Sequence, residues 1–145
     1  MHVPAPMITI MTLVVGLFLF PLAAQAEWRS TCDYPQFNII RGTPYMSTIC
    51  RGSGQGPLCV MLDLGHCYMN SNGHLAAVQN GHFERSCRNC HFTGDNHTVF
   101  ACNCEMFGRD APWQYTEIET NELVENKDGL LACWDGGQKK CPGQP

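Results

Sequence analysis

Residues 28–32 are Trp-Arg-Ser-Thr-Cys, and residues 83–87 are Phe-Glu-Arg-Ser-Cys. Each stretch places an aromatic residue four positions before a cysteine that follows Ser or Thr, and the two cysteines lie 55 positions apart. Three more pairs of segments match in the same order at offsets of 54 to 56: 46–50 with 100–104, 62–64 with 118–120, and 70–75 with 126–131. Self-similarity at one period is the signature of an internal repeat. The sequence therefore predicts two tandem copies, over about residues 28–78 and 82–134.

The residues within each copy predict short β-strands separated by turns. Apolar and polar residues alternate over 37–40, 46–50, 60–64, 99–102 and 115–118, as they do in half-buried strands. Segments 41–44 and 94–96 have the composition of hairpin turns. No stretch has a long 3.6-residue period, so we expect helix only as single turns at 66–69 and 122–125. These turns precede Gly73 and Gly129, which would supply positive φ angles. The predicted fold class is mainly β, with antiparallel strands and hairpins.

The first 26 residues are typical of an export signal. Met7 to Phe20 is an almost unbroken apolar run, and Ala24-Gln25-Ala26 is the small-x-small pattern that signal peptidase recognises. The run is shorter than the roughly 20 residues of a spanning helix, which disfavours the alternative of a retained membrane anchor. We expect cleavage before Glu27, leaving 119 of the 145 residues and a secreted, extracellular protein. Its domain would cover 27–135, followed by a flexible tail over 136–145 that is fixed only at Cys141.

All ten cysteines lie in the predicted mature part: Cys32, Cys50, Cys59, Cys67, Cys87, Cys90, Cys102, Cys104, Cys133 and Cys141. An even number of cysteines in a small exported domain predicts a disulfide scaffold. If 87–92 and 99–104 pair as antiparallel strands, bridges Cys87–Cys104 and Cys90–Cys102 fit one register and the crossed bridges do not. Cys32–Cys50 is the equivalent bridge of the first copy. The other four cysteines have three pairings, and spacing does not choose among them, although Cys59–Cys67 and Cys133–Cys141 are the most local.

Several functional classes are disfavoured. The formal net charge of −4 argues against a nucleic-acid partner, since such proteins are normally basic. Cys87-x-x-Cys90 followed by Cys102-x-Cys104 superficially resembles a zinc site. The second pair is C-x-C rather than the spacing common in such sites, and an exported chain meets oxidant before free zinc. We find no nucleophile with a base, and the glycine-rich stretch 52–56 predicts a hairpin loop because no helix follows it. We therefore expect no enzyme activity, no cofactor, no metal and no membrane contact after signal cleavage.

Asn96-His97-Thr98 is a glycosylation sequon on a predicted hairpin tip.

Several repeated elements resemble the cyanovirin-N homology domain, a family of small lectins built from two tandem repeats. They include Ser30-Thr31-Cys32, Leu62-Asp63-Leu64, Asn70-x-Asn72-Gly73-x-Leu75, Ser86-Cys87 and Asn126-x-Asp128-Gly129-x-Leu131. The resemblance covers about residues 28–134, and the extra cysteines are similar to those of fungal members. It implies an elongated, pseudo-symmetric antiparallel fold in which the two repeats exchange strands. It also implies mannose-type glycans as ligands, bound in a non-catalytic site at each end.

The resemblance implies two sets of carbohydrate-binding residues. At one end they are Ser30, Thr31, Arg51, Ser53, Asn126, Lys127 and Asp128. At the other end they are Asn70, Asn72, His82, Arg85, Ser86 and Glu105. Such short polar side chains donate to and accept from sugar hydroxyls. An alternative is that the Asn and Asp residues of these sets only form the turns before the glycines.

The sequence departs from the family pattern at both ends. Arg51 and Arg85 stand where binding members commonly carry an acidic residue, and Glu27 and Glu105 where they carry a basic one. Met106 and Phe107 also replace polar residues. The leading prediction is a secreted lectin for oligosaccharides or glycoproteins of the mannose type, either monomeric or swapped into a dimer about a hinge at 77–81. The alternative is a secreted interaction or effector protein that has kept the fold, lost sugar binding and binds a protein partner.

Overall fold

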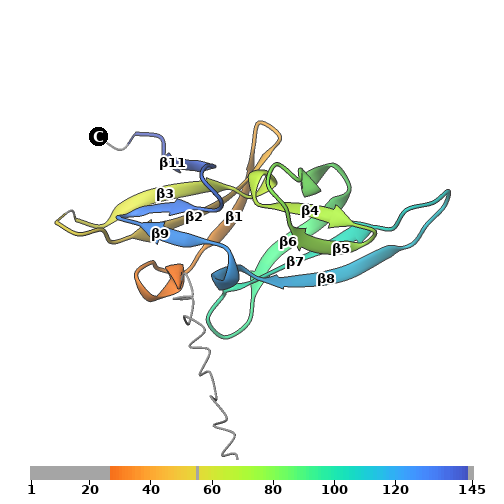
Figure 1. Ribbon diagram of the computed structural model, residues 1–145, viewed down its shortest axis with the longest axis horizontal. Coiled ribbons are helices and arrows are strands. Elements are labelled where there is room, and N and C mark those ends of the chain that lie inside the picture. The colour runs from red at the N-terminus through yellow and green to blue at the C-terminus, as the bar shows by residue number, and fades with distance from the viewer. Residues whose placement is uncertain (1–26, 55, 144–145) are drawn as a thin grey trace, which may run out of the picture.

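A computed structural model describes residues 27–54 and 56–143, and the expected export signal lies outside this range. The chain forms an elongated structure of short strands and single 3-10 turns (Figure 1). The elements are η1 (Trp28–Ser30), β1 (Gln36–Ile40), β2 (Thr43–Cys50), β3 (Leu58–Asp63), η2 (Leu64–His66), β4 (Tyr68–Ser71), β5 (His74–Ala77), η3 (Phe83–Arg85), β6 (Cys87–Thr93), β7 (Val99–Glu105), β8 (Trp113–Glu119), η4 (Thr120–Glu122), β9 (Glu125–Lys127), β10 (Leu130–Ala132) and β11 (Gln138–Lys140). No helix among the described residues is long and apolar enough to cross a membrane.

The strands form two halves that exchange hairpins. One sheet has the order β1-β2-β3-β11, and the other has the order β6-β7-β8. The β4–β5 hairpin belongs to the first copy but lies beside β6–β8, and the β9–β10 hairpin of the second copy lies beside β2 and β3 (Figure 1). The Leu75 N–H donates to Thr116 Oγ1 at 3.0 Å, which joins β5 to β8. The predicted pseudo-symmetric architecture with exchanged strands is therefore confirmed.

All five predicted strands are present, with ends within three residues of those expected. The first hairpin turn is tighter than expected, because only Arg41 and Gly42 lie outside the ladder and Thr43 pairs with Ile40. The glycine-rich stretch after Arg51 connects the antiparallel strands β2 and β3, as predicted. The tail differs from the expectation of a flexible segment. Residues 138–140 form β11, which pairs with β3 and makes it an internal strand of the sheet.

The helical turns lie earlier in the chain than predicted. Residues 68–71 are strand, and the turns occupy 64–66 and 120–122. The cause is an acidic residue at the end of the preceding strand: Asp63 Oδ1 accepts the Gly65 N–H at 2.9 Å, and Glu119 Oε1 accepts the Asn121 N–H at 3.0 Å. Such side-chain caps start a turn at once. Two further 3-10 turns, η1 and η3, hold the equivalent aromatic residues Trp28 and Phe83.

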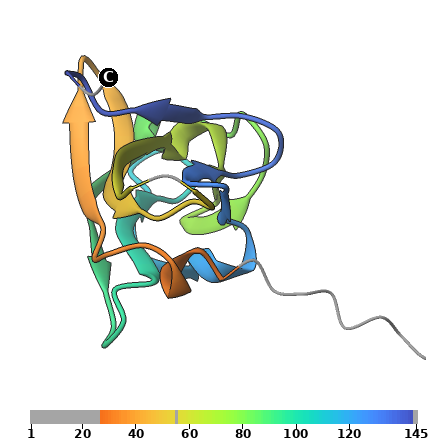
Figure 2. The same cartoon turned by 90° about the vertical axis from the view of Figure 1, so that its left-hand side faces the viewer.

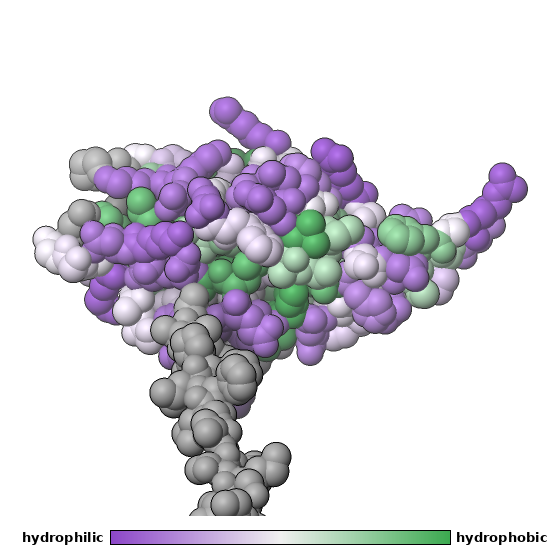
Figure 3. Space-filling view, in the orientation of Figure 1, coloured by the Kyte–Doolittle hydropathy of each residue, from purple (hydrophilic) through white to green (hydrophobic). Residues whose placement is uncertain are grey.

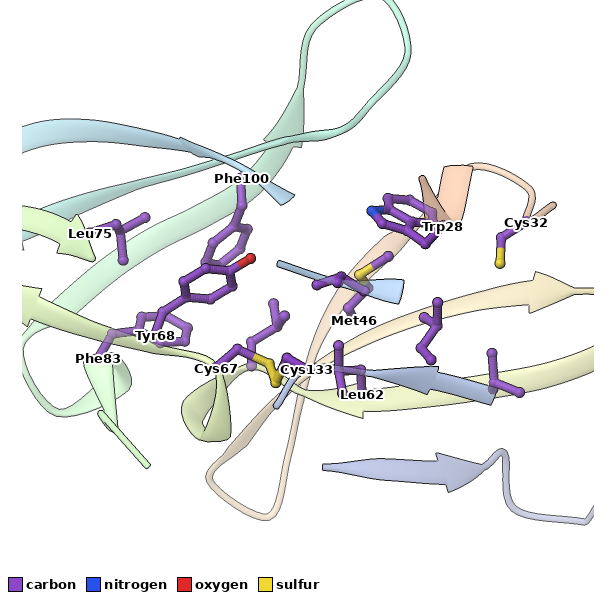
Figure 4. Close-up of a cluster of buried hydrophobic side chains, with 14 of the residues drawn as sticks. Trp28, Cys32, Met46, Leu62, Cys67, Tyr68, Leu75, Phe83, Phe100 and Cys133 are labelled. Atoms are coloured by element: carbon purple, nitrogen blue, oxygen red, sulfur yellow. A yellow bond between two sulfur atoms is a disulfide. The ribbon is translucent and has the colours of Figure 1, made fainter. Parts of the chain in front are cut away.

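The core runs through both halves and is centred on aromatic residues. Figure 4 shows Phe100 beside Tyr68 and Phe83 in the second half, and Trp28 beside Met46 in the first. The ring of Phe100 lies 5.4 Å from that of Phe83 in an edge-on arrangement, which is a favourable geometry for aromatic pairs. Trp28 is fully buried, and its Nε1 donates to Thr120 Oγ1 at 3.1 Å. The core therefore joins the first residues of the domain to the second copy.

Five disulfides use all ten cysteines. The two bridges predicted from the register, Cys87–Cys104 and Cys90–Cys102, are present, as is Cys32–Cys50, predicted from the repeat. The remaining bridges are Cys59–Cys141 and Cys67–Cys133, so the most local alternative is not the one formed. Cys67–Cys133 joins the two copies, and Cys59–Cys141 joins the first copy to the C-terminal tail, because the exchanged hairpins and β11 bring distant segments together. The four thiols considered as zinc ligands are all in disulfides.

Candidate functional site

The Asn126 side chain is the centre of a polar cluster at the end of the first half. Its Nδ2 donates to Thr31 Oγ1 at 2.8 Å and to the Arg51 carbonyl at 3.0 Å, and its Oδ1 accepts the Gly129 N–H at 2.7 Å. Thr31 and Asn126 are 95 positions apart, and they meet because the β9–β10 hairpin packs on the first half. Asn126 therefore forms the turn before Gly129, as the alternative interpretation predicts, and it also links this turn to the segments of Thr31 and Arg51.

Asp128 and Ser53 form the outer part of this cluster. The Ser53 N–H and hydroxyl donate to Asp128 Oδ1 at 2.7 and 2.6 Å. These bonds, that of the hydroxyl above all, hold the pKa of the Asp128 carboxyl below its usual range. Asp128 has a φ of 53°, and its backbone passes so close to Gly52 that a Cβ there would lie 2.5 Å from the Asp128 carbonyl oxygen. The cluster therefore presents a carboxylate and hydroxyls in fixed positions on a mainly hydrophilic surface, seen over β9 in Figure 3.

The second half repeats the same arrangement around Asn70. Its Nδ2 donates to Ser86 Oγ at 2.9 Å and to the Glu105 carbonyl at 2.7 Å, and its Oδ1 accepts the Gly73 N–H at 2.7 Å. Asn72 Oδ1 accepts the Phe107 N–H at 2.8 Å, as Asp128 accepts that of Ser53. The two clusters are therefore built by the same hydrogen bonds at equivalent positions.

The second cluster differs from the first in what covers it. Met106 stands at the position of Gly52, and its Cγ lies 2.8 Å from the point that a Cβ on Gly73 would occupy. Phe107, at the position of Ser53, has 73% of its surface exposed. Asn72 supplies a neutral amide instead of a carboxylate. The second cluster thus has an apolar cover and fewer groups that bind a hydroxyl.

Some predicted site residues lie outside the hydrogen-bonded clusters. In the first half, the Lys127 ammonium pairs with Glu125 Oε1 at 2.8 Å, and the Ser30 hydroxyl donates to the Glu27 carbonyl at 2.8 Å. The Arg51 side chain pairs with Asp33 at 3.7 Å, so only its backbone takes part. In the second half, Arg85 is exposed to solvent, and His82 Nδ1 pairs with Glu84 Oε1 at 3.1 Å.

Sequence reasoning missed the role of Gly52. The glycine-rich stretch 52–56 predicts only a hairpin loop, although alignment of the two copies sets Gly52 against Met106. That alignment contained the signal, because a glycine opposite a large side chain marks a close approach of backbones.

The fold and the clusters define a class of protein: a pseudo-symmetric, strand-exchanged β protein of two repeats with one polar cluster in each half. Comparison with known proteins identifies its family. The model of the CVNH domain matches residues 28–132. The chain therefore belongs to the CVNH family, as the sequence resemblance predicted. The comparison with curated proteins gave no match.

Solved structures with the same fold include several family members. A variant of MoCVNH3 in complex with (N-GlcNAc)4 has a TM-score of 0.64 at 15% identity and aligns with 75% of this chain and 97% of its own. The CVNH protein of Gibberella zeae has a TM-score of 0.59 at 17% identity, over 74% of this chain and 97% of its own. Microvirin in complex with mannobiose has a TM-score of 0.59 at 22% identity, over 74% of this chain and 98% of its own. At these identities the likeness shows the fold.

Proposed function

We propose that this protein is a secreted, non-catalytic lectin that binds mannose-type glycans at the cluster around Asn126 and Asp128. The observation that carries the proposal is the exposed Ser53–Asp128 pair next to the Thr31–Asn126 pair. Together they offer oriented acceptors and donors to adjacent sugar hydroxyls. Membership of the CVNH family supports the proposal, as do the relatives in complex with mannobiose and (N-GlcNAc)4.

The remaining properties belong to the same proposal. Five disulfides fit a protein that folds in an oxidising, exported compartment. Asn96 is exposed in the turn between β6 and β7, which suits the proposed glycan at its sequon. The second cluster, around Asn70 and Glu105, is proposed as a weaker second sugar site.

Titration of the mature protein with α-mannosides, followed by NMR, tests the proposal. We expect binding at millimolar ligand or below, with shifts in residues 31, 53 and 126–128. Asp128→Ala should abolish binding at the first site, because Asp128 supplies the carboxylate that is hydrogen-bonded into that cluster. Glu105→Ala should remove any response of the second site alone.

Asp110→Ala is the matched control, since Asp110 is also exposed and has a similar φ of 58°. This variant removes a carboxylate from the same backbone conformation elsewhere, and it should bind like the unchanged protein. Absence of binding to any mannoside at millimolar concentration would exclude the lectin function.

A second candidate function is the binding of a protein partner at the other end of the molecule. The observation that favours it is the exposed Phe107 next to Met106, where the first cluster has Ser53 and Gly52. The inverted charges at Arg85 and Glu105 also favour a protein partner over a sugar at this end. If no sugar binds, Phe107→Ser should reduce the affinity for a partner isolated from the host.

A further inference from the structure

A cavity of about 500 Å³ lies between the β1–β2 hairpin and the C-terminal strand, away from both polar clusters. It is lined by Ile40, Arg41, Thr43, Tyr45, Met61, Lys139, Lys140 and Pro142. Its volume is within the range of about 300–1,000 Å³ that is common for small-molecule sites. Figure 2 shows the C-terminal strand and the tip of this hairpin on the same side of the molecule.

The lining of this cavity is cationic, although the protein as a whole is acidic. Three of the nine Lys and Arg residues of the chain line it, and among the described residues no Asp or Glu does. The Lys139 ammonium donates to the Tyr45 hydroxyl at 2.9 Å and lies 5.3 Å from the centre of its ring. Tyr45 and Met61 are each only 7% exposed and form an apolar floor beneath these cations.

The cavity belongs to one half only, so it is not a general feature of the repeat. At the position of Met61 the second copy has Glu117, and at the position of Tyr45 it has Val99. The second sheet ends at β8, whereas β3 is paired with β11 and the Cys59–Cys141 disulfide holds that strand in place. The C-terminal segment therefore builds one wall of the cationic cavity, and among the described residues no strand pairs with the outer edge of β8 in the same way.

The backbone at Arg41 supports a role for its side chain. Arg41 and Gly42 have φ angles of 52° and 82° and form the two-residue turn between β1 and β2. Such turns favour Asn-Gly, since Asn adopts a positive φ more readily than Arg. An arginine at this position is less favourable for the turn, and strain of this kind is often found at functional positions.

We propose that this cavity binds an oxyanion: a phosphate, sulfate or carboxylate group, either free or attached to a sugar. The Arg41 guanidinium and the Lys139 ammonium would donate charge-assisted hydrogen bonds to the anion. The apolar floor formed by Tyr45 and Met61 would lie under the ring of an attached sugar. The proposal is independent of mannoside binding at the Asp128 cluster.

NMR titrations of the mature protein at low salt test the proposal, with inorganic phosphate, inorganic sulfate, glucuronic acid, mannose 6-phosphate and neutral mannose as probes. We expect shifts at residues 40–45 and 139–141 with the anionic probes, weakening as salt is raised. Tighter binding of mannose 6-phosphate than of inorganic phosphate would identify an anionic sugar as the ligand. Equal binding would identify the free anion. No anion-dependent shift at these residues, or an equal shift with neutral mannose, would overturn the proposal.

Arg41→Asn is the sharpest variant, because it removes the cation while placing a favoured residue in the turn. We expect about tenfold weaker anion binding with no loss of folding stability. Lys139→Met should weaken binding comparably. Arg109→Gln, which removes a charge from an exposed loop elsewhere, and Asp128→Ala should leave anion binding unchanged. Unchanged affinity in Arg41→Asn would also overturn the proposal.

Discussion

At the scale of single residues, the bond between Ser53 and Asp128 should be visible in a titration. Ser53→Ala removes the hydroxyl that is the main cause of the lowered pKa of Asp128, so this pKa should rise towards the ordinary value of about 3.9. Because the folded state lowers the pKa, the stabilisation is present above the ordinary value and is lost as the pH falls through the lowered one. NMR titration of the Asp128 carboxyl carbon measures the shift. An unchanged pKa in Ser53→Ala would contradict the assigned hydrogen bond.

At the scale of elements, the β6–β7 hairpin carries a disulfide that its counterpart lacks. Cys90–Cys102 bridges the ladder at the irregularity between Arg88 and His91 and closes a loop with a sequence separation of 12. Replacing both cysteines by alanine should lower the free energy of unfolding by about 3 kcal/mol in the chain-entropy model. Denaturant unfolding of the oxidised proteins measures this difference. Mannoside binding at Asp128 is the control and should be unchanged, while a loss below about 1 kcal/mol would contradict the model.

For the molecule as a whole, we expect two disulfides to control any exchange between the monomer and the proposed swapped dimer. Cys59 and Cys67 of the first copy are bonded to Cys141 and Cys133, beyond the proposed hinge at 77–81. An oxidised monomer should therefore remain monomeric in size-exclusion chromatography at high protein concentration. Refolding from the reduced state at high concentration should give dimers that persist on a non-reducing denaturing gel. A swapped dimer that separates into monomers on such a gel would contradict this expectation.

Features that depend on local pattern could be predicted from the amino-acid sequence. The period near 55 residues defined two copies, the alternation defined five strands, and the register of one hairpin defined bridges Cys87–Cys104 and Cys90–Cys102. The strands and the two bridges follow from residues close in sequence, where spacing alone fixes the distance in space, and the copies follow from comparing the sequence with itself. The polar residues of both clusters came from the resemblance to the family, and the structure joins most of them by hydrogen bonds.

Features that join segments far apart in the chain could not be predicted from local pattern and became visible in the folded protein. The bridges Cys59–Cys141 and Cys67–Cys133 span 82 and 66 positions, and their partners were chosen by the packing of the exchanged hairpins and of β11. The cationic cavity has the same origin, because Arg41 and Lys139 meet only when β11 pairs with β3. A local pattern fixes which residues of a strand face a core. The pairing of segments far apart depends instead on which of many possible chain arrangements buries the most apolar surface for its cost in loop-closure entropy.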